Sequence, residues 1–358
     1  MIFIPAPVQK VTDTRVVSSL PLPSPSEMAA HMPRTEKQLE FVGQARREIH
    51  DIIHQKDKRL MAVVGPCSIH DLEAGLEYAE KLRELAEELG DRMLIIMRVY
   101  FEKPRTTTGW KGLIMDPHLN GTYDIPSGLR IARQFLGEVL DLGVPTATEL
   151  LDPITPQYIA DSLSWAAIGA RTVESQTHRQ MASGLSMPVG FKNSTAGDCN
   201  VAINAIVAAT QEQTFFGITS EGRASAVTTA GNPDCQLILR GGADCPNYSS
   251  QHVADAVSIS EKVGINPSIM IDCSHGNSSK DPERQPLVLQ DVAQQITSGN
   301  GHIHAVMLES NLKGGNQKVP ANVNDLDYGV SITDACLDWE ATKKTLQNTH
   351  AALACRFS

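Results

Sequence analysis

Short apolar runs recur along this chain, and most are followed by a segment with the periodicity of an amphipathic helix. The runs do not alternate like a half-exposed strand, which is typical of parallel strands buried on both faces. We predict eight strands, at residues 60–64, 93–99, 144–148, 165–169, 187–191, 236–239, 268–271 and 304–308. Helices are predicted at residues 73–89, 128–142, 156–163, 200–210, 250–263, 287–296 and 333–353. This alternation indicates an α/β fold, the (β/α)8 TIM barrel. A Rossmann fold is the alternative, but no Gly-x-Gly-x-x-Gly sequence follows any predicted strand.

Three segments lie outside this repeating pattern. Residues 1–35 contain six prolines and are predicted to form an extended arm without helix, with a disordered tail as the alternative. Residues 36–54 have the apolar spacing of an amphipathic helix. Residues 214–218 and 224–229 flank a turn-like Ser-Glu-Gly sequence, so we expect an inserted β-hairpin at about residues 212–230, for regulation or assembly. The chain of 358 residues then divides into an N-terminal arm, 1–35, and a single barrel domain, 36–358.

The composition limits the classes of partner and the cellular compartment. The formal net charge is −10, which argues against a general affinity for nucleic acid or for an anionic membrane. The seven cysteines are widely spread and form no Cys-x-x-Cys pair, so neither a zinc ribbon nor a disulfide framework is expected. The start of the chain is too proline-broken for a signal peptide, and no apolar run approaches the roughly 18 residues of a membrane span. We therefore expect a cytoplasmic protein.

Basic side chains gather at the predicted strand ends. The C-terminal ends of barrel strands carry the chemistry of TIM-barrel enzymes, so residues there are expected to share one mouth. Six cations occupy such positions: Arg98, Lys103, Arg105, Arg171, Lys192 and Arg240. Arginine forks match the oxygens of phosphates and carboxylates. In an acidic protein, this local cluster predicts one or more substrates that carry several negative charges.

Metal-binding residue types follow other predicted strands. Cys67 comes after the first strand, His275 after the seventh and Glu309 ends the eighth, while Asp334 lies further along the chain. A thiolate, an imidazole and one or two carboxylates suit a divalent transition metal such as Zn, Fe or Mn. Cys273 is a second candidate thiolate because it lies two residues before His275, and the choice depends on strand register.

These residues stand within motifs that together resemble the type I 3-deoxy-D-arabino-heptulosonate 7-phosphate (DAHP) synthases. The resemblance extends from about residue 36 to Trp339. The matching motifs are Gly65–Asp71, Lys103–Thr107, Gly169–Arg171, Gly190–Asn193, Leu239–Gly242, Ser274–Ser278, Glu309–Asn311 and Ser331–Asp334. It implies an enzyme that condenses phosphoenolpyruvate with erythrose 4-phosphate, the first step towards the aromatic amino acids.

The resemblance also assigns roles to residues. It implies one divalent metal per subunit, Mn, Fe, Co or Zn, and settles the thiolate as Cys67; the implied ligands are Cys67, His275, Glu309 and Asp334. Phosphoenolpyruvate contacts fall on Arg98, Lys103, Arg171, Lys192 and Arg240. Arg105 and Thr106 match the residues that hold erythrose 4-phosphate, and Glu149 ends a strand in the same substrate site. Lys103 is the expected proton donor to the new alkoxide, so Lys103, Cys67 and His275 form the predicted catalytic group.

Regulation is a further implication of the resemblance. The family binds a feedback inhibitor, Phe, Tyr or Trp, at the inserted hairpin, and the contacts fall on Gly217, Ser186 and Phe215. Phe-sensitive members tend to carry serine at the position of Gly217, so its glycine suggests inhibition by Tyr. The family assembles as homodimers or homotetramers, with the arm reaching a neighbour's hairpin. Ser194 replaces a usual glycine, and residues before 36 have no close match.

Three alternatives remain at this point. A related synthase that uses arabinose 5-phosphate shares the barrel and the phosphoenolpyruvate site, but the Lys103–Thr107 motif, the arm and the hairpin argue against it. An aldolase that forms a Schiff base through Lys192 is the second. The third is a non-catalytic barrel that senses an amino acid, which the intact substrate and metal residues disfavour. The native metal, the inhibitor and the choice between dimer and tetramer remain open.

Overall fold

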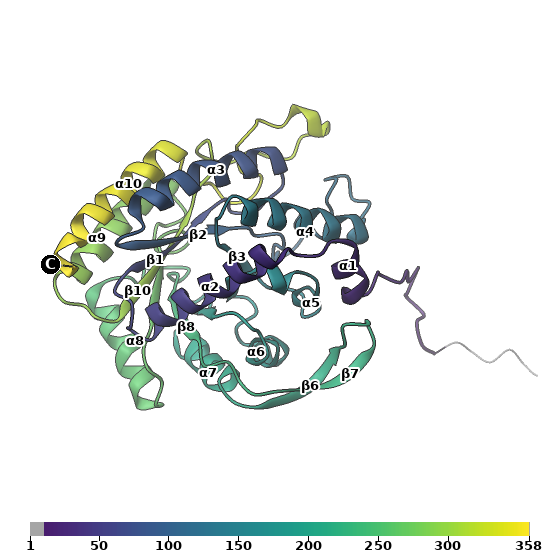
Figure 1. The fold of residues 1–358 in the computed structure, drawn as a ribbon, viewed down its shortest axis with the longest axis horizontal. Coiled ribbons are helices and arrows are strands. Elements are labelled where there is room, and N and C mark those ends of the chain that lie inside the picture. The colour runs from purple at the N-terminus through teal and green to yellow at the C-terminus, as the bar shows by residue number, and fades with distance from the viewer. Residues whose placement is uncertain (1–10, 358) are drawn as a thin grey trace, which may run out of the picture.

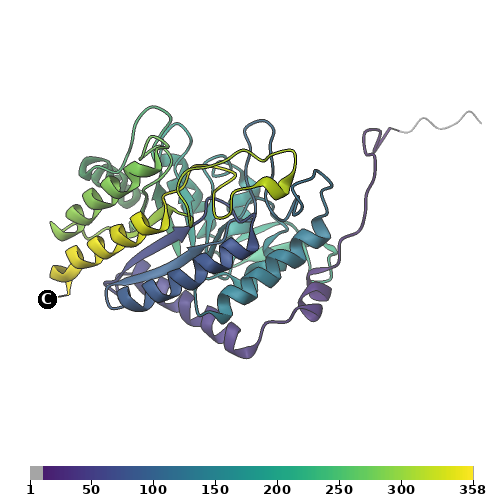
Figure 2. The same ribbon diagram turned by 90° about the horizontal axis from the view of Figure 1, so that it is seen from above.

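Eight parallel strands close into a barrel, which confirms the predicted fold class (Figures 1 and 2). The computed structural model describes residues 11–357. The strands lie around the barrel in the order β1-β10-β9-β8-β5-β4-β3-β2, and all their residues are buried. They are β1 (Leu60–Gly65), β2 (Met93–Arg98), β3 (Thr146–Glu149), β4 (Trp165–Ile168), β5 (Val189–Lys192), β8 (Cys235–Leu239), β9 (Ile269–Asp272) and β10 (Ile303–Glu309). Burial on both faces explains why the strands read as unbroken apolar runs.

Helices cover the outside of the barrel (Figure 1). They are α3 (Leu72–Leu89), α4 (Ile125–Asp141), α5 (Pro156–Ile159), α6 (Gln176–Ser183), α7 (Asn200–Ala209), α8 (Ser250–Lys262), α9 (Gln285–Thr297) and α10 (Trp339–Ala352). Short 3-10 turns lie at Ala160–Ser162, Pro282–Arg284, Val323–Asp325 and Leu353–Arg356. No helix is predicted at α6, because this short, polar segment has only two apolar residues. The remaining helices confirm the predicted positions to within a few residues, except at α10.

The predicted start of the last helix, at residue 333, is wrong. The helix α10 begins at Trp339, where the side chain of Asp338 accepts a hydrogen bond from the backbone N–H of Ala341. The preceding residues instead lie beside the loop that follows β10, with Cys336 and Gly315 exchanging backbone hydrogen bonds. This pairing outcompetes the helix and leaves Asp334 in a bend at the barrel mouth.

The prediction that the N-terminal arm contains no helix is also wrong. Helix α1 (Pro25–His31) lies within it, followed by α2 (Glu36–Ile53). Pro25 occupies the first turn, where a missing N–H has no intrahelical acceptor to lose. Ser24 and Glu27 form a reciprocal capping box, with the Glu27 N–H donating to Ser24 Oγ and the Ser24 N–H donating to Glu27 Oε2. Residues 11–24 contain no helix or strand, and the part of the arm at residues 1–10 lies outside the described residues.

Helix α2 closes the N-terminal end of the barrel. Its Ile49, Ile52 and Ile53 are buried in one cluster with side chains that fill the barrel interior, among them Met61 and Trp165. A second, larger cluster lies between the strands and the outer helices. The N-terminal end is therefore packed, while the C-terminal ends of the strands carry the open face.

The inserted hairpin is confirmed as β6 (Gln213–Ile218) paired antiparallel with β7 (Ala224–Thr229). It stands outside the barrel and extends towards α1 (Figure 1). The backbone N–H of Ser26 in α1 donates to the carbonyl of Ser220 in the hairpin turn at 2.8 Å. The arm therefore contacts the hairpin of its own chain. None of the helices within residues 11–357 has the length and apolar character needed to cross a membrane.

Candidate active site at the barrel mouth

A cavity lies at the C-terminal ends of the strands, and most of the predicted site residues line it. Five of the six predicted cations do so: Lys103, Arg105, Arg171, Lys192 and Arg240. Thr106, Glu149, His275, Glu309 and Asp334 also line it. Cys67 is fully buried at its floor, in contact with Lys103 and Asp334. The structure therefore brings together residues that are up to 267 positions apart in the sequence.

The predicted metal-binding atoms converge on the floor of this cavity. One ligand atom each from Cys67, Glu309 and Asp334 lie within 4.8 Å of one another. Cys67 Sγ is 3.6 Å from Asp334 Oδ2, and it accepts a hydrogen bond from the backbone N–H of Asp334 at 3.4 Å. His275 approaches the same group, with Nε2 3.7 Å from Glu309 Oε1. A thiolate, an imidazole and two carboxylates are ligands that suit Zn, Fe, Mn or Co, so this group fits a divalent transition metal.

Strand pairing and one glutamine position Glu309. Gly65 of β1 pairs with Glu309 of β10, which places Cys67, two residues beyond Gly65, beside the carboxylate. Gln285, the first residue of α9, accepts from the N–H of Glu309 and donates to its carbonyl, both at 2.9 Å. Gln285 is not among the residues predicted from the sequence. A glutamine at the start of a helix does not by itself indicate a functional role. Its partner, the backbone of Glu309, comes near only when the barrel closes.

Asp272 orients His275. Ser274 Oγ lies 2.7 Å from His275 Nδ1 and donates to Asp272 Oδ1 at 2.7 Å, while Asp272 Oδ2 lies 2.9 Å from the same ring nitrogen. This leaves Nε2 facing Glu309. Burial opposes ionisation of Asp272, but His275 and Lys192 hold its pKa well below the usual range. His275 itself has a φ of +55°, a left-handed conformation that turns the chain just beyond β9. A carboxylate behind a ligating imidazole is the usual second partner that fixes a histidine towards a metal.

Cys273, the alternative thiolate, is placed away from the cavity. It is fully buried, and its thiol faces the carbonyl of Ile271 and the hydrophobic cluster outside the strands. Adjacent residues of a strand point to opposite faces, so Cys273 and the inward-facing Asp272 cannot both reach the mouth. Cys67 is the thiol that meets the carboxylates.

Lys103 lies at the centre of the charged floor. Its Nζ is 3.1 Å from Cys67 Sγ and 3.4 Å from the Cys67 carbonyl. Burial alone would lower its pKa, but Cys67, Glu309 and Asp334 raise the pKa above the ordinary lysine value. Burial and the charge of Glu309 raise the pKa of the Cys67 thiol to about 11. Lys103 is therefore a protonated ammonium in this site, able to donate a proton.

Lys192 is also held as a cation. Its Nζ lies 3.5 Å from Glu149 Oε2 and 3.5 Å from Asp272 Oδ2, and all three side chains are buried. Burial would lower the pKa of Lys192, but Tyr100 and Glu149 raise it. A lysine that serves as a Schiff-base nucleophile needs a lowered pKa, so this environment argues against that alternative.

Arg98 differs from the other five cations, because it lies beneath the cavity. It is fully buried; Nη2 donates to Glu309 Oε1 at 3.0 Å, and Nε donates to the Pro66 carbonyl at 3.3 Å. Its guanidinium stacks 3.8 Å from the centre of the Tyr100 ring. Arg98 thus fixes Glu309 and supplies positive charge from below. Tyr100 was not foreseen from the sequence, where it reads as one more apolar residue beyond β2.

The outer part of the cavity is formed by exposed cations. Arg105 Nε donates to the Trp110 carbonyl at 2.7 Å, which holds the side chain along its own loop. Arg171 Nε donates to Thr106 Oγ1 at 3.3 Å and so joins the loops after β2 and β4. Arg240 is half-buried after β8. The cavity therefore has a buried inner part and a more exposed outer part, each with positive charge.

Three buried asparagines hold the loops after β5, β8 and β9 together. Asn193 Oδ1 accepts from the Arg240 N–H at 2.7 Å, and Asn247 Oδ1 accepts from the Gly241 N–H at 2.7 Å. Asn277 Nδ2 donates to the carbonyls of Leu239 and Asp272. These bonds position Arg240 and His275 relative to each other. Asn193 and Asn277 lie within the predicted motifs, whereas Asn247 gave no signal in the sequence.

Two of the three predicted inhibitor residues, Phe215 and Gly217, lie in the hairpin, and none of the three lines the barrel-mouth cavity. Phe215 and Gly217 occupy alternate positions of β6 and so face the same side of the hairpin. A Cβ atom at Gly217 would come within 2.8 Å of Val227 Cγ2 on the paired strand. Phe215 also lines a pocket between α6 and the hairpin with Gln176 and Gln180. Ser186 is exposed in the loop between α6 and β5.

Comparisons with known proteins give consistent matches over nearly the whole chain. Residues 32–347 match the DAHP synthetase I family. The Tyr-sensitive phospho-2-dehydro-3-deoxyheptonate aldolase of Escherichia coli (strain K12) is 51% identical over 96% of this chain and 95% of that protein. The Phe-sensitive enzyme of the same organism is also 51% identical, over 96% of this chain and 98% of that protein. A solved phospho-2-dehydro-3-deoxyheptonate aldolase from Francisella tularensis SCHU S4 has a TM-score of 0.93 and 48% identity, covering 95% of this chain and 99% of that chain.

Proposed function

Because this chain belongs to the DAHP synthetase I family, we propose that the barrel-mouth cavity is its active site and that the predicted residues divide the work there. The reaction joins phosphoenolpyruvate, erythrose 4-phosphate and water to give DAHP and phosphate, the first step of the shikimate pathway. The observation that carries the assignment is the convergence of Cys67, Glu309 and Asp334 within 4.8 Å, beside protonated Lys103.

We assign phosphoenolpyruvate to the inner part of the cavity. We take Lys103 and Lys192 as the cations of this part, with Arg171 and Arg240 reaching it from the outer part and Arg98 adding charge from beneath. A substrate with both a carboxylate and a phosphate needs several cations close together. Each anionic group pairs best with the guanidinium of an arginine or the ammonium of a lysine. Glu149, paired with Lys192, limits the net positive charge and keeps that ammonium in place.

Erythrose 4-phosphate is assigned to the outer part. Arg105 and Thr106 are exposed there and present a guanidinium and a hydroxyl to a phosphate. The hydrogen bond from Arg171 Nε to Thr106 Oγ1 supports an arrangement in which the two proposed subsites adjoin each other. Two phosphorylated molecules would otherwise repel, so holding both on neighbouring cations contributes to the rate through proximity.

One divalent metal per subunit, Mn, Fe, Co or Zn, is assigned to Cys67, His275, Glu309 and Asp334. When bound, such an ion supplies a Lewis acid that polarises the aldehyde oxygen or orients water. Cys67 must lose its proton to ligate. The positive charge of a bound ion would offset the cost that burial sets on the thiolate. Asp272 and Gln285 keep His275 and Glu309 aimed at the same point.

Lys103 is assigned as the general acid. As C3 of phosphoenolpyruvate attacks the aldehyde carbon, the aldehyde oxygen becomes an alkoxide that needs a proton. Lys103 carries that proton, since the surrounding negative groups keep its pKa high. Water then adds at C2, and the phosphate leaves with the bridging oxygen.

The division of subsites can be tested with two arginine variants. Arg105→Ala should raise KM for erythrose 4-phosphate by about tenfold to a hundredfold, the loss of one charge-assisted contact, with little change in KM for phosphoenolpyruvate. Arg240→Ala should show the opposite pattern. Steady-state kinetics with each substrate varied in turn measure both. Equal effects on the two KM values in both variants would contradict the assignment.

Feedback inhibition by Tyr is the regulation we propose. Gly217 has no side chain on the face of β6 that carries Phe215, and the Phe-sensitive members of the family tend to carry serine at this position. Overall identity does not separate Tyr-sensitive from Phe-sensitive relatives, since both reach 51%. Inhibition curves for Phe, Tyr and Trp test the proposal directly. Gly217→Ser should weaken inhibition by Tyr, and stronger inhibition of the unmodified enzyme by Phe or Trp would refute it.

We also propose that the chain forms a homodimer or homotetramer through its arm. Val11, Val17 and Leu20 are 84%, 100% and 84% exposed, an apolar surface without a partner in the described chain. Burial of these side chains by a neighbour would remove that surface from water. Light scattering of the full chain and of a chain without residues 1–22 tests this. A monomeric full-length protein would contradict it.

A further inference from the structure

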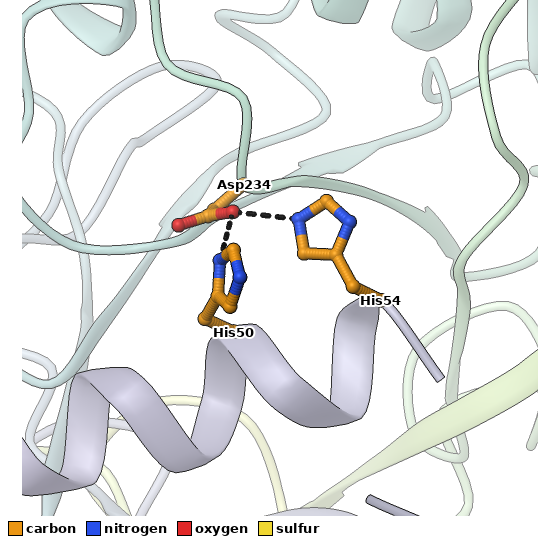
Figure 3. A group of neighbouring side chains, drawn as sticks. All are labelled: His50, His54 and Asp234. Atoms are coloured by element: carbon orange, nitrogen blue, oxygen red, sulfur yellow. Dashed lines mark hydrogen bonds and ion pairs between the residues drawn. The ribbon is translucent and has the colours of Figure 1, made fainter. Parts of the chain in front are cut away.

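A second group of metal-ligand side chains lies at the opposite end of the barrel from the cavity. His50 belongs to the last turn of α2, His54 is the C-cap residue just after that helix, and Asp234 immediately precedes β8. His50 Nδ1 and His54 Nε2 each lie 2.8 Å from the same oxygen of Asp234, Oδ1 (Figure 3). The barrel-mouth assignments involve none of these three residues.

The sequence places the two rings together on one face of α2. Residues four positions apart on a helix are neighbours, and the ring centroids of His50 and His54 are 4.3 Å apart. Asp234 is held just as firmly: its N–H donates to Asn232 Oδ1 at 3.0 Å, and its carbonyl accepts from Val189 at 2.8 Å. The three side chains are therefore presented by a helix and by the start of a barrel strand, which are rigid supports for a binding site.

The tautomer of His50 follows from Lys56. Lys56 Nζ lies 3.2 Å from His50 Nε2, and an ammonium can only donate, so Nε2 accepts and Nδ1 carries the ring proton. A cation at Nδ1 needs the other tautomer, with the proton on Nε2. Lys56 must then turn away, which its 62% exposed side chain permits. Asp51 Oδ1, 3.8 Å from Nζ, is an alternative partner for the ammonium.

We propose that His50, His54 and Asp234 bind a divalent transition-metal ion of the kind that imidazole favours, such as Zn or Co. A tetrahedral ion with bonds of about 2.0 Å sets its ligand atoms roughly 3.3 Å apart. The ligand atoms here lie within 4.8 Å of one another, with two separations of 2.8 Å, so small rotations reach that geometry. The partly exposed side chains leave room for water as the fourth ligand.

Charge also favours a cation at this place. The carbonyl end of α2 carries a partial negative charge, and the carboxylate of Asp234 adds a full one. The ion ties the helix that closes the barrel to the linker between the hairpin and β8. Since the three ligands come together only in the folded chain, binding stabilises the fold.

Zinc stoichiometry tests the proposal. The full-length enzyme, dialysed against excess Zn²⁺ alone, should retain two ions per chain, and His54→Gln should retain one. Asp234→Asn should also retain one ion. This second variant serves if His54→Gln folds poorly, because its amide oxygen can still accept the histidine hydrogen bonds. His350→Gln is the matched control, because it removes a histidine that contacts Asp91 at the end of another helix at 2.6 Å; it should retain two ions. An equal number of ions in the unmodified enzyme and in both cluster variants would overturn the proposal, whereas one ion fewer in every protein, with the difference kept, would count against the barrel-mouth site alone.

Cobalt distinguishes the two sites by spectrum. Co²⁺ at the barrel mouth should show a sulfur-to-metal charge-transfer band from Cys67, whereas the ion on His50, His54 and Asp234 should show ligand-field bands without it. Lys56→Gln should lower the dissociation constant of the sulfur-free site by up to about fivefold, the effect of removing one exposed repelling charge. An unchanged dissociation constant in Lys56→Gln would contradict an ion placed at His50 Nδ1.

Discussion

The protonation state of a buried side chain in the cavity depends on two opposing effects, burial and nearby charge. Lys103 is the clearest example. Cys67, Glu309 and Asp334 outweigh the burial of its ammonium and keep it protonated. Lys103→Arg retains a positive charge but offers a much poorer proton donor, so kcat should fall on the order of 10² to 10⁴. The KM for phosphoenolpyruvate should change much less. Steady-state kinetics separate the two, and a variant that loses only substrate affinity would contradict the role of Lys103 as the acid.

The single carboxyl group of Glu102 should make the stability of the fold depend on pH. Its buried carboxyl accepts hydrogen bonds from the N–H groups of Leu151 and Asp152 and from Thr155 Oγ1. Burial nevertheless raises its pKa to about 7, from an ordinary 4.5. The folded state thus binds this proton more tightly than the unfolded chain. The stability that the group contributes is full below pH 4.5 and is lost as the pH rises towards 7, by roughly 3 kcal/mol.

Denaturant unfolding of the natural chain and of Glu102→Gln between pH 4.5 and 7.5 measures this effect. The natural chain should lose unfolding free energy relative to the variant as pH rises, because all other titrating groups are common to both. Parallel stability profiles would show that Glu102 has an ordinary pKa in the fold.

Residue identities at the site could be predicted from the sequence where they belong to strand ends or to family motifs. Cys67, His275, Glu309 and Asp334 are such residues, and three of these four present ligand atoms within 4.8 Å. Gln285, Tyr100 and Asn247 could not be predicted, because their partners are backbone and side-chain groups that only the closed barrel brings near. Arg98 was expected at the cavity mouth, but its side chain is fully buried beneath the cavity.

Between elements, the loops after β8 and β9 approach so closely that only glycine fits. A Cβ at Gly276 would lie 2.5 Å from the Gly242 carbonyl oxygen. Gly276→Ala should therefore push apart the loops that carry Arg240 and His275, costing about 1–3 kcal/mol of stability and on the order of a hundredfold in kcat/KM. Gly301→Ala, with no atom within 4 Å of the added methyl, is the control. Equal activity in the two variants would show that the close approach is not needed.

The positions of the eight strands followed from unbroken apolar runs, and the position of α2 followed from its periodic apolar spacing. Capping and tertiary pairing decided the exceptions. The proline-rich arm holds a helix because Pro25 and the Ser24–Glu27 capping box suit a first turn. The last helix starts late because residues before Asp338 pair with the loop after β10. Local composition alone does not reveal either competition.

The whole molecule has two chemically different ends. Helix α2 packs the N-terminal end with isoleucines, and the three side chains of the proposed second metal site lie at its C-terminal turn. The open end gathers five lining cations above buried carboxylates and a thiol, in a protein whose overall charge is −10. Such a local field concentrates anionic substrates that the molecule as a whole repels.

Phosphate release from phosphoenolpyruvate tests the central assignment most directly. The purified enzyme is assayed with and without erythrose 4-phosphate, before and after removal of metal with EDTA, and again after addition of Mn²⁺. Rapid release is predicted only when both erythrose 4-phosphate and a divalent metal are present, and Asp334→Asn should remain slow at moderate Mn²⁺. Release without the second substrate, or undiminished release after complete metal removal, would contradict the account.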